Sequence, residues 1–172
     1  MDIQHWKSIL PEDFSPESRV WIYQSSRAFT EKESDKIGNL LSEYCTQWIS
    51  HNRPVKGWVK LLFNQFIIFI SDDTQDKLCG SAIDNSIRFV KEIEREFNVG
   101  LLDRMMLAFL ADDEIKIFPV NKVHTALEKG FINPDTCYFN NSVTTKDSLE
   151  NNWIIPLKNS WIGKKYVQDT LK

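Results

Sequence analysis

One polar stretch carries the residue types that could perform chemistry, and it lies between an apolar run and a helix-like run. Two carboxylates, Asp72 and Asp73, are followed by Cys79-Gly80-Ser81 and by Asp84. Cys79 and Ser81 are potential nucleophiles, because a helix start can activate a thiol and can bind an anion. The carboxylates could hold a hydrated cation. This set would suit a small hydrolase or transferase with a nucleotide or phosphate-related substrate.

A histidine base is absent from this stretch. The three histidines, His5, His51 and His124, are widely separated, and they form neither a metal-ligand pattern nor a triad pattern. His51 follows the first predicted helix, and we expect it at the opposite end of the fold from Ser81. The simpler interpretation of Gly80 and Ser81 is a turn and a helix cap. We therefore assign no metal and no cofactor, and we favour a binding role over catalysis.

Two amphipathic helices are predicted to position these residues. Thr30 with Glu33 has the spacing of a capping box, and the apolar stripe that follows predicts a helix that ends near residues 49–51. Ser81 with Asp84 has the same spacing, and it predicts the start of a second helix that runs to residue 97.

The hydrophobic pattern also predicts five strands. They alternate with the helices in the order β-α-β-β-α-β plus one added strand, which predicts an α+β, ferredoxin-like split βαβ antiparallel sheet. We expect a single domain over residues 1–172, with its core in residues 19–120 and a C-terminal extension, residues 121–172, packed on the core. Trp153 and Trp161 in this extension require burial. The strands cover residues 19–24, 55–63, 66–70, 105–110 and 115–118.

The first and third strands are expected to lie side by side and parallel, so that both helices begin at one edge of the sheet. Free backbone N–H groups and the helix dipoles would make that edge a site for a phosphate or carboxylate. The leading hypothesis is a soluble binding or regulatory domain for a small anionic ligand or a protein partner at this edge. The candidate ligand-binding residues are Ser25, Ser26, Arg27, Thr30, Asp72, Asp73, Cys79, Gly80, Ser81 and Asp84.

Composition and charge exclude several other classes of protein. The chain has 172 residues, is 42% hydrophobic and carries a net charge of −3 with no block of lysines or arginines, so neither nucleic acid nor membrane is expected as a partner. Aromatic residues reach 12%, but no RNA-binding signature string occurs at the third strand. The start of the chain lacks a signal-peptide pattern, and the longest apolar run is too short to span a bilayer, which predicts a cytoplasmic protein.

Cysteine spacing predicts free thiols, whereas the sheet edges leave the oligomeric state open. Cys45, Cys79 and Cys137 are far apart and form no C-x-x-C pair, so we expect reduced thiols with no disulfide framework and no zinc site. A subunit that pairs through its sheet edges remains an alternative to a ligand-binding domain, and the pattern leaves the oligomeric state open.

Several segments together resemble a known family. They are Arg19-Val20-Trp21-Ile22-Tyr23-Gln24-Ser25, Cys79 to Asp84 with Arg88-Phe89, Asp103-Arg104-Met105, Tyr138-Phe139-Asn140-Asn141, and Asn152-Trp153 to Trp161. This pattern resembles a family of small uncharacterised bacterial cytosolic proteins that are often labelled "ABC transporter ATPase", and the resemblance covers nearly the whole chain. The label implies no assigned chemistry, and the chain lacks the G-x-x-x-x-G-K-[ST] loop of such ATPases. Family members usually have a cysteine where Ser81 stands, so the resemblance implies no essential-thiol mechanism for this chain.

Overall fold

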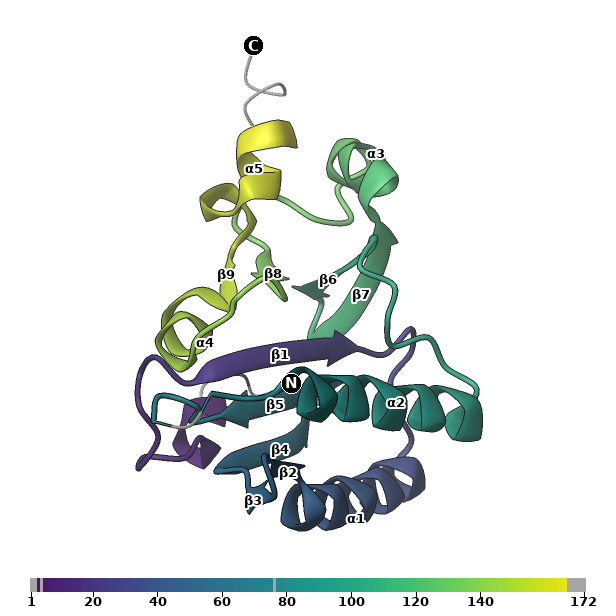
Figure 1. Cartoon of the computed structure of the whole chain (residues 1–172). Helices are drawn as coiled ribbons and strands as arrows, with labels where there is room; N and C mark the ends of the chain where they lie inside the picture. Colours follow the sequence, from purple (N-terminus) through teal and green to yellow (C-terminus); the bar gives the residue numbers. More distant parts are fainter. Residues whose placement is uncertain (1–2, 4, 76, 167–172) are drawn as a thin grey trace. The chain divides into compact units, whose positions relative to one another are not determined.

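The computed structural model describes residues 3, 5–75 and 77–166, and the chain forms two compact units (Figure 1). Among the described residues, the N-terminal unit comprises residues 3, 5–75, 77–102 and 143–150, and the C-terminal unit comprises residues 103–142 and 151–166. The expectation of a single domain over the whole chain stays a prediction. Among the described residues, no helix is both long enough and apolar enough to cross a membrane.

The N-terminal unit is built on a three-stranded antiparallel sheet. Its strands are β1 (Arg19–Gln24), β4 (Gly57–Leu62) and β5 (Phe66–Ser71), in the order β1-β5-β4. The strands predicted around these residues are confirmed. β4 and β5 are joined by a tight turn over residues 63–65, in which Phe63 and Asn64 both have positive φ, 54° and 52°, and the Gln65 N–H donates to the Leu62 carbonyl at 3.0 Å.

The expectation that the first and third strands run parallel is wrong. β1 pairs with β5 antiparallel, with Arg19 opposite Ser71 and Gln24 opposite Phe66. The crossover through the first helix brings β4 back parallel to β1, and the hairpin turn then reverses the chain, so β5 must oppose both. The two helices that follow β1 and β5 therefore begin at opposite ends of the sheet.

The structure shows a mixed α+β chain with antiparallel sheets, but it does not confirm a ferredoxin-like topology. The order β1-β5-β4 is that of a split βαβ unit. The next strand, β6 (Met106–Ala111), pairs instead in the sheet of the C-terminal unit.

Two long helices cover one face of the N-terminal sheet, α1 (Glu31–Gln47) and α2 (Gly80–Phe97) (Figure 1). Ile37 and Leu41 of α1 and Val90 and Ile93 of α2 pack with strand residues in one core, since their spacing places them on a single helix stripe. From β5, Ile67 and Phe69 face these helices.

The capping box predicted at the start of α1 is present, and the one predicted at the start of α2 is not. The Thr30 hydroxyl accepts a hydrogen bond from the Glu33 N–H at 3.3 Å, and the Glu33 carboxylate accepts one from the Thr30 N–H at 2.8 Å, which confirms the capping box. The predicted box of Ser81 and Asp84 is wrong. Cys79 is the N-cap residue, and its side chain makes no cap hydrogen bond.

Short elements complete the N-terminal unit. A small hairpin of β2 (Ile49–Ser50) and β3 (Arg53–Pro54) follows α1, and η1 (Trp6–Ile9) precedes β1. The helix α4 (Lys146–Asn152) begins in the returning segment, whose Thr144 carbonyl accepts a hydrogen bond from the Val20 N–H at 2.9 Å.

The C-terminal unit holds a four-stranded sheet in the order β7-β6-β8-β9. The remaining strands are β7 (Glu114–Pro119), β8 (Cys137–Phe139) and β9 (Ile154–Pro156), and the helical segments are η2 (Val120–Lys122), α3 (Val123–Glu128), η3 (Leu157–Asn159) and α5 (Trp161–Tyr166). Trp153 is fully buried, as expected. Trp161 is 49% exposed, so its predicted burial is wrong: it stands at the first position of a short surface helix.

Candidate functional site

The ten predicted ligand-binding residues fall into two groups at opposite ends of the N-terminal sheet. The group that follows β1 lies near the end of α2, because Arg27 donates to the Phe97 carbonyl at 2.9 Å and Ser26 accepts from the Gly100 N–H at 3.0 Å. The group that follows β5 lies at the start of α2, where Asp73 faces Arg19 at 3.2 Å. The expectation of one edge shared by both groups is wrong, since β1 and β5 are antiparallel.

The group near Arg27 has local structural roles. Two Arg27 nitrogens pair with the two Glu33 carboxylate oxygens at 2.8 and 2.9 Å, beside the capping box of α1. The hydrogen bonds from Arg27, together with the Thr30 N–H, lower the pKa of Glu33 to about 2. These contacts fix the turn into α1, and the binding role predicted for Ser25, Ser26, Arg27 and Thr30 stays a prediction.

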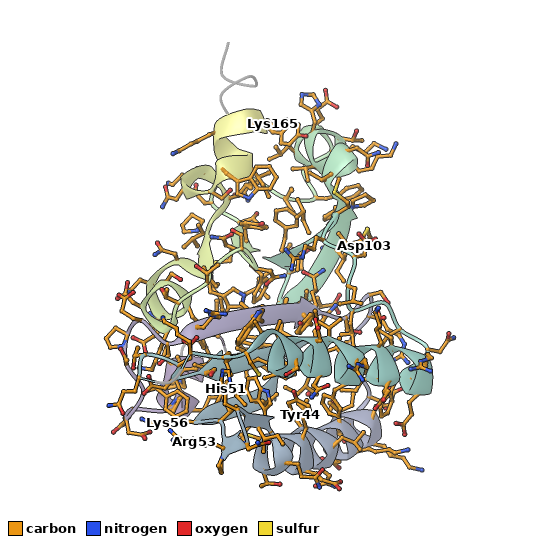
Figure 2. All side chains as sticks on the ribbon, viewed as in Figure 1. Tyr44, His51, Arg53, Lys56, Asp103 and Lys165 are labelled. Carbon is orange, nitrogen blue, oxygen red and sulfur yellow. The ribbon has the colours of Figure 1, made fainter. Side chains whose placement is uncertain are left out.

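A pocket of about 460 Å³ lies at the other end, between the β2–β3 hairpin, the end of β5 and the loop that leads to α2. The side chains of His51, Arg53 and Lys56, labelled in Figure 2, come from the hairpin and from the segment before β4. Of the predicted residues, only Asp72 lines this pocket directly. The lining residues are Ser50, His51, Arg53, Pro54, Val55, Lys56, Ser71, Asp72, Gln75 and Leu78.

Cys79 is not itself a lining residue, but it contacts two residues that line the pocket, Ser50 and His51. The Ser50 hydroxyl donates to Cys79 Sγ at 3.3 Å, and the Ser81 hydroxyl lies 3.1 Å from the same sulfur. These two hydroxyls, with the backbone N–H groups of Ala82 and His51, lower the pKa of the thiol from 9.0 to about 6. Cys79 is therefore largely a thiolate at neutral pH, although its side chain remains partly exposed.

Lys56 forms ion pairs with two carboxylates at one side of the pocket. Lys56 Nζ lies 3.0 Å from an Asp72 carboxylate oxygen and 3.2 Å from an Asp13 carboxylate oxygen. Burial opposes ionisation of Asp72, but hydrogen bonds from Thr74 and Lys56 outweigh it and keep the pKa of this carboxyl below its usual value. The hydrogen bond to Asp72 raises the pKa of Lys56, so both groups are charged at neutral pH.

Ser71 contributes a polar group that the fold leaves without a partner. Its side chain is fully buried, and the hydroxyl has no hydrogen-bond partner among the described residues. Side chains alternate along a strand, so Ser71 shares the helix-facing side of β5 with Ile67 and Phe69, and it lines the pocket. A buried hydroxyl without a partner costs about 1–3 kcal/mol, which a polar ligand atom would offset.

The remaining predicted residues surround the start of α2. Gly80 and Asp84 are exposed there, and Asp73 is 3% exposed beside Arg19. Ser81 lies inside the first turn of the helix, where its hydroxyl contacts Cys79. Among the described residues, no group of three or more histidine, cysteine, aspartate or glutamate side chains is arranged to hold a metal ion.

Sequence reasoning missed most of the pocket. His51 was expected far from Ser81, yet its backbone N–H donates to the sulfur of Cys79, since the β2–β3 hairpin folds back toward α2. His51 and Asn52 form a turn with φ of 50° and 60°. The sequence signal for this turn is an asparagine in a polar run shortly before a strand.

Comparisons of the chain with protein-family models, with curated proteins and with solved structures give no match. The resemblance to the family labelled "ABC transporter ATPase" therefore stays a prediction.

Proposed function

We propose that the N-terminal unit binds a small anionic ligand in the pocket at the start of α2. In this proposal the anion binds at the start of one helix, and not at a sheet edge where two helices begin. The observation that carries the proposal is the pocket itself, which combines cationic side chains with a buried, unpartnered hydroxyl at Ser71.

Positive groups at the pocket support the binding of an anion. The lining includes two permanent cations, Arg53 and Lys56, and one carboxylate, Asp72. Asp72 and Asp13 offset the charge of Lys56. Arg53 is exposed at the pocket, and the positive end of the α2 dipole lies beside the Cys79 thiolate, so both groups favour a negative charge there.

The polar groups of the pocket suit a ligand with several oxygen atoms. The hydroxyl of Ser71 and the guanidinium of Arg53 are able to donate hydrogen bonds to phosphate or carboxylate oxygens. Leu78, Val55 and Pro54 supply apolar surface that a short carbon skeleton could contact. A small phosphorylated or carboxylated metabolite is therefore the class of ligand that fits.

A second candidate function is that of a small transferase or hydrolase. The observation that favours it is the set of hydrogen bonds to Cys79 Sγ, which stabilises the nucleophilic thiolate. Asp72 is engaged with Lys56, and Asp73 faces Arg19, so neither carboxylate has the position of a base for this sulfur.

Thermal unfolding in the presence of candidate anions tests the proposed function. Nucleoside monophosphates, sugar phosphates and dicarboxylates are screened against the whole chain. A ligand at one hundred times its dissociation constant should raise the melting temperature by about 5–10 °C. The variant Arg53→Gln should lose this shift, while Arg95→Gln, in the last turn of α2, should keep it. No shift with any anion, or an equal shift in Arg53→Gln, would contradict the proposal.

A further inference from the structure

We propose that the Cys79 thiolate is the nucleophile of this pocket and that its substrates are small anions that carry an electrophilic carbon. The inference rests on the proposed function, because Arg53 and the start of α2 would hold the anion beside the sulfur. It goes further by naming the reacting atom and the class of compound.

The surroundings of Cys79 differ from those of the other two cysteines. Its sulfur receives hydrogen bonds from Ser50 and from two backbone N–H groups and lies 3.1 Å from the Ser81 hydroxyl. Burial instead raises the pKa of Cys45 and of Cys137. The chain therefore holds one stabilised thiolate and two protonated thiols, which serve as internal controls.

Ser71 is an independent sign that the neighbouring space takes a ligand. Its hydroxyl is fully buried, has no partner among the residues that the structure describes, and lies on the helix-facing side of β5. Ser71 and Ser50 line the same pocket, and Ser50 is hydrogen-bonded to Cys79 in both directions. A ligand oxygen that pairs with Ser71 would thus bring its carbon skeleton to the pocket that Cys79 borders.

The chemical step needs no oxidant, metal or second reactant. The thiol proton is already lost to solvent, and the sulfur lone pair forms a new S–C bond. The bond from that carbon to its leaving group breaks, and the leaving group departs with the bonding electrons. The product is a thioether or, when the carbon belongs to an acyl group, a thioester on Cys79.

Two alkylating reagents test the inference. Iodoacetate and iodoacetamide share the reacting carbon and the iodide leaving group, but only iodoacetate is an anion. Alkylation of each cysteine in the folded chain is followed by mass spectrometry across a range of pH. With iodoacetamide at pH 6.5, Cys79 should react roughly tenfold faster than Cys45 and Cys137, since its larger thiolate fraction outweighs its lower intrinsic nucleophilicity. Its rate should be half-maximal near pH 6.

The ratio of the two rates reports the anion site. For Cys79, the rate with iodoacetate divided by the rate with iodoacetamide should exceed the same ratio for free glutathione by roughly fivefold or more. Arg53→Gln should lower the iodoacetate rate more than the iodoacetamide rate, so that their ratio falls toward that of glutathione, and the control Arg95→Gln should leave the ratio unchanged.

The two halves of the inference fail in different ways. If iodoacetamide modifies Cys79 no faster than Cys45 and Cys137, Cys79 is not the nucleophile, whatever the pocket binds. If Cys79 reacts fast but its rate ratio equals that of glutathione, the anion site is absent, and the proposed function fails with it.

Discussion

Ser50 and Cys79 are joined by two hydrogen bonds. The Ser50 hydroxyl donates to Cys79 Sγ at 3.3 Å and accepts from the Cys79 backbone N–H at 3.0 Å. The two residues are 29 positions apart, so this contact joins the β2–β3 hairpin to the start of α2. Because Ser50 also lines the pocket, the thiol and the pocket are parts of one local arrangement.

Removal of the Ser50 hydroxyl should make the thiol less acidic. Its hydrogen bond is the largest cause of the lowered pKa of Cys79, so in Ser50→Ala this pKa should rise from about 6 toward the ordinary value of 9.0. The ultraviolet absorbance of the thiolate, followed against pH, measures the change. Ser42→Ala, on the exposed side of α1, is the matched control and should leave the titration unchanged. An unchanged midpoint in Ser50→Ala would contradict the assignment.

Cys79 should make the stability of the chain depend on pH. Its pKa is about 6 in the folded state and near 9.0 when unfolded, so the folded state binds fewer protons between these values. The stabilisation is fully present above pH 9 and is lost as the pH falls through 6. The wild-type chain should therefore lose more unfolding free energy over this interval than Cys79→Ala. Urea denaturation at a series of pH values measures this, and parallel curves for the two proteins would refute it.

A side chain at position 57 should destabilise the fold. A Cβ there would stand 2.6 Å from Cε3 of Trp48, a buried ring that packs against Tyr44 and Phe69. Gly57→Ala should lower the free energy of unfolding by about 1–3 kcal/mol, since the packed ring must move. Gly38→Ala is the control, because nothing lies within 4 Å of its Cβ position on α1. That change should stabilise the chain by about 0.5–1 kcal/mol, and equal effects of the two substitutions would contradict the packing argument.

The two predicted capping boxes should respond differently to alanine. Thr30→Ala removes an observed cap and should lower the free energy of unfolding by about 1 kcal/mol. Ser81→Ala removes no cap, and its main effect should be a higher pKa of the Cys79 thiol. Chemical denaturation and thiol titration of both variants separate these outcomes. A larger loss of stability in Ser81→Ala than in Thr30→Ala would contradict the helix starts described above.

Local patterns in the sequence predicted elements well, but they did not predict which residues meet. The apolar run at residues 66–70 and the Thr30–Glu33 spacing each depend on neighbours in the chain, and both were confirmed. The meeting of Ser50 with Cys79 depends on the direction of β5 and on where the β2–β3 hairpin folds, and no periodicity records either. Ser71 could not have been singled out, because a lone serine at a strand end reveals neither its burial nor its missing partner.

Amide NMR spectra of the whole chain, recorded during a titration with inorganic phosphate, test directly whether the pocket at the start of α2 binds an anion. The largest shifts should occur at the amides of His51, Cys79 and Ala82, which surround the thiol beside the pocket, and Arg53→Gln should abolish them while Arg95→Gln should not. Saturable shifts confined to the other end of the sheet, around Arg27 and Thr30, or no saturable shifts at all, would contradict it.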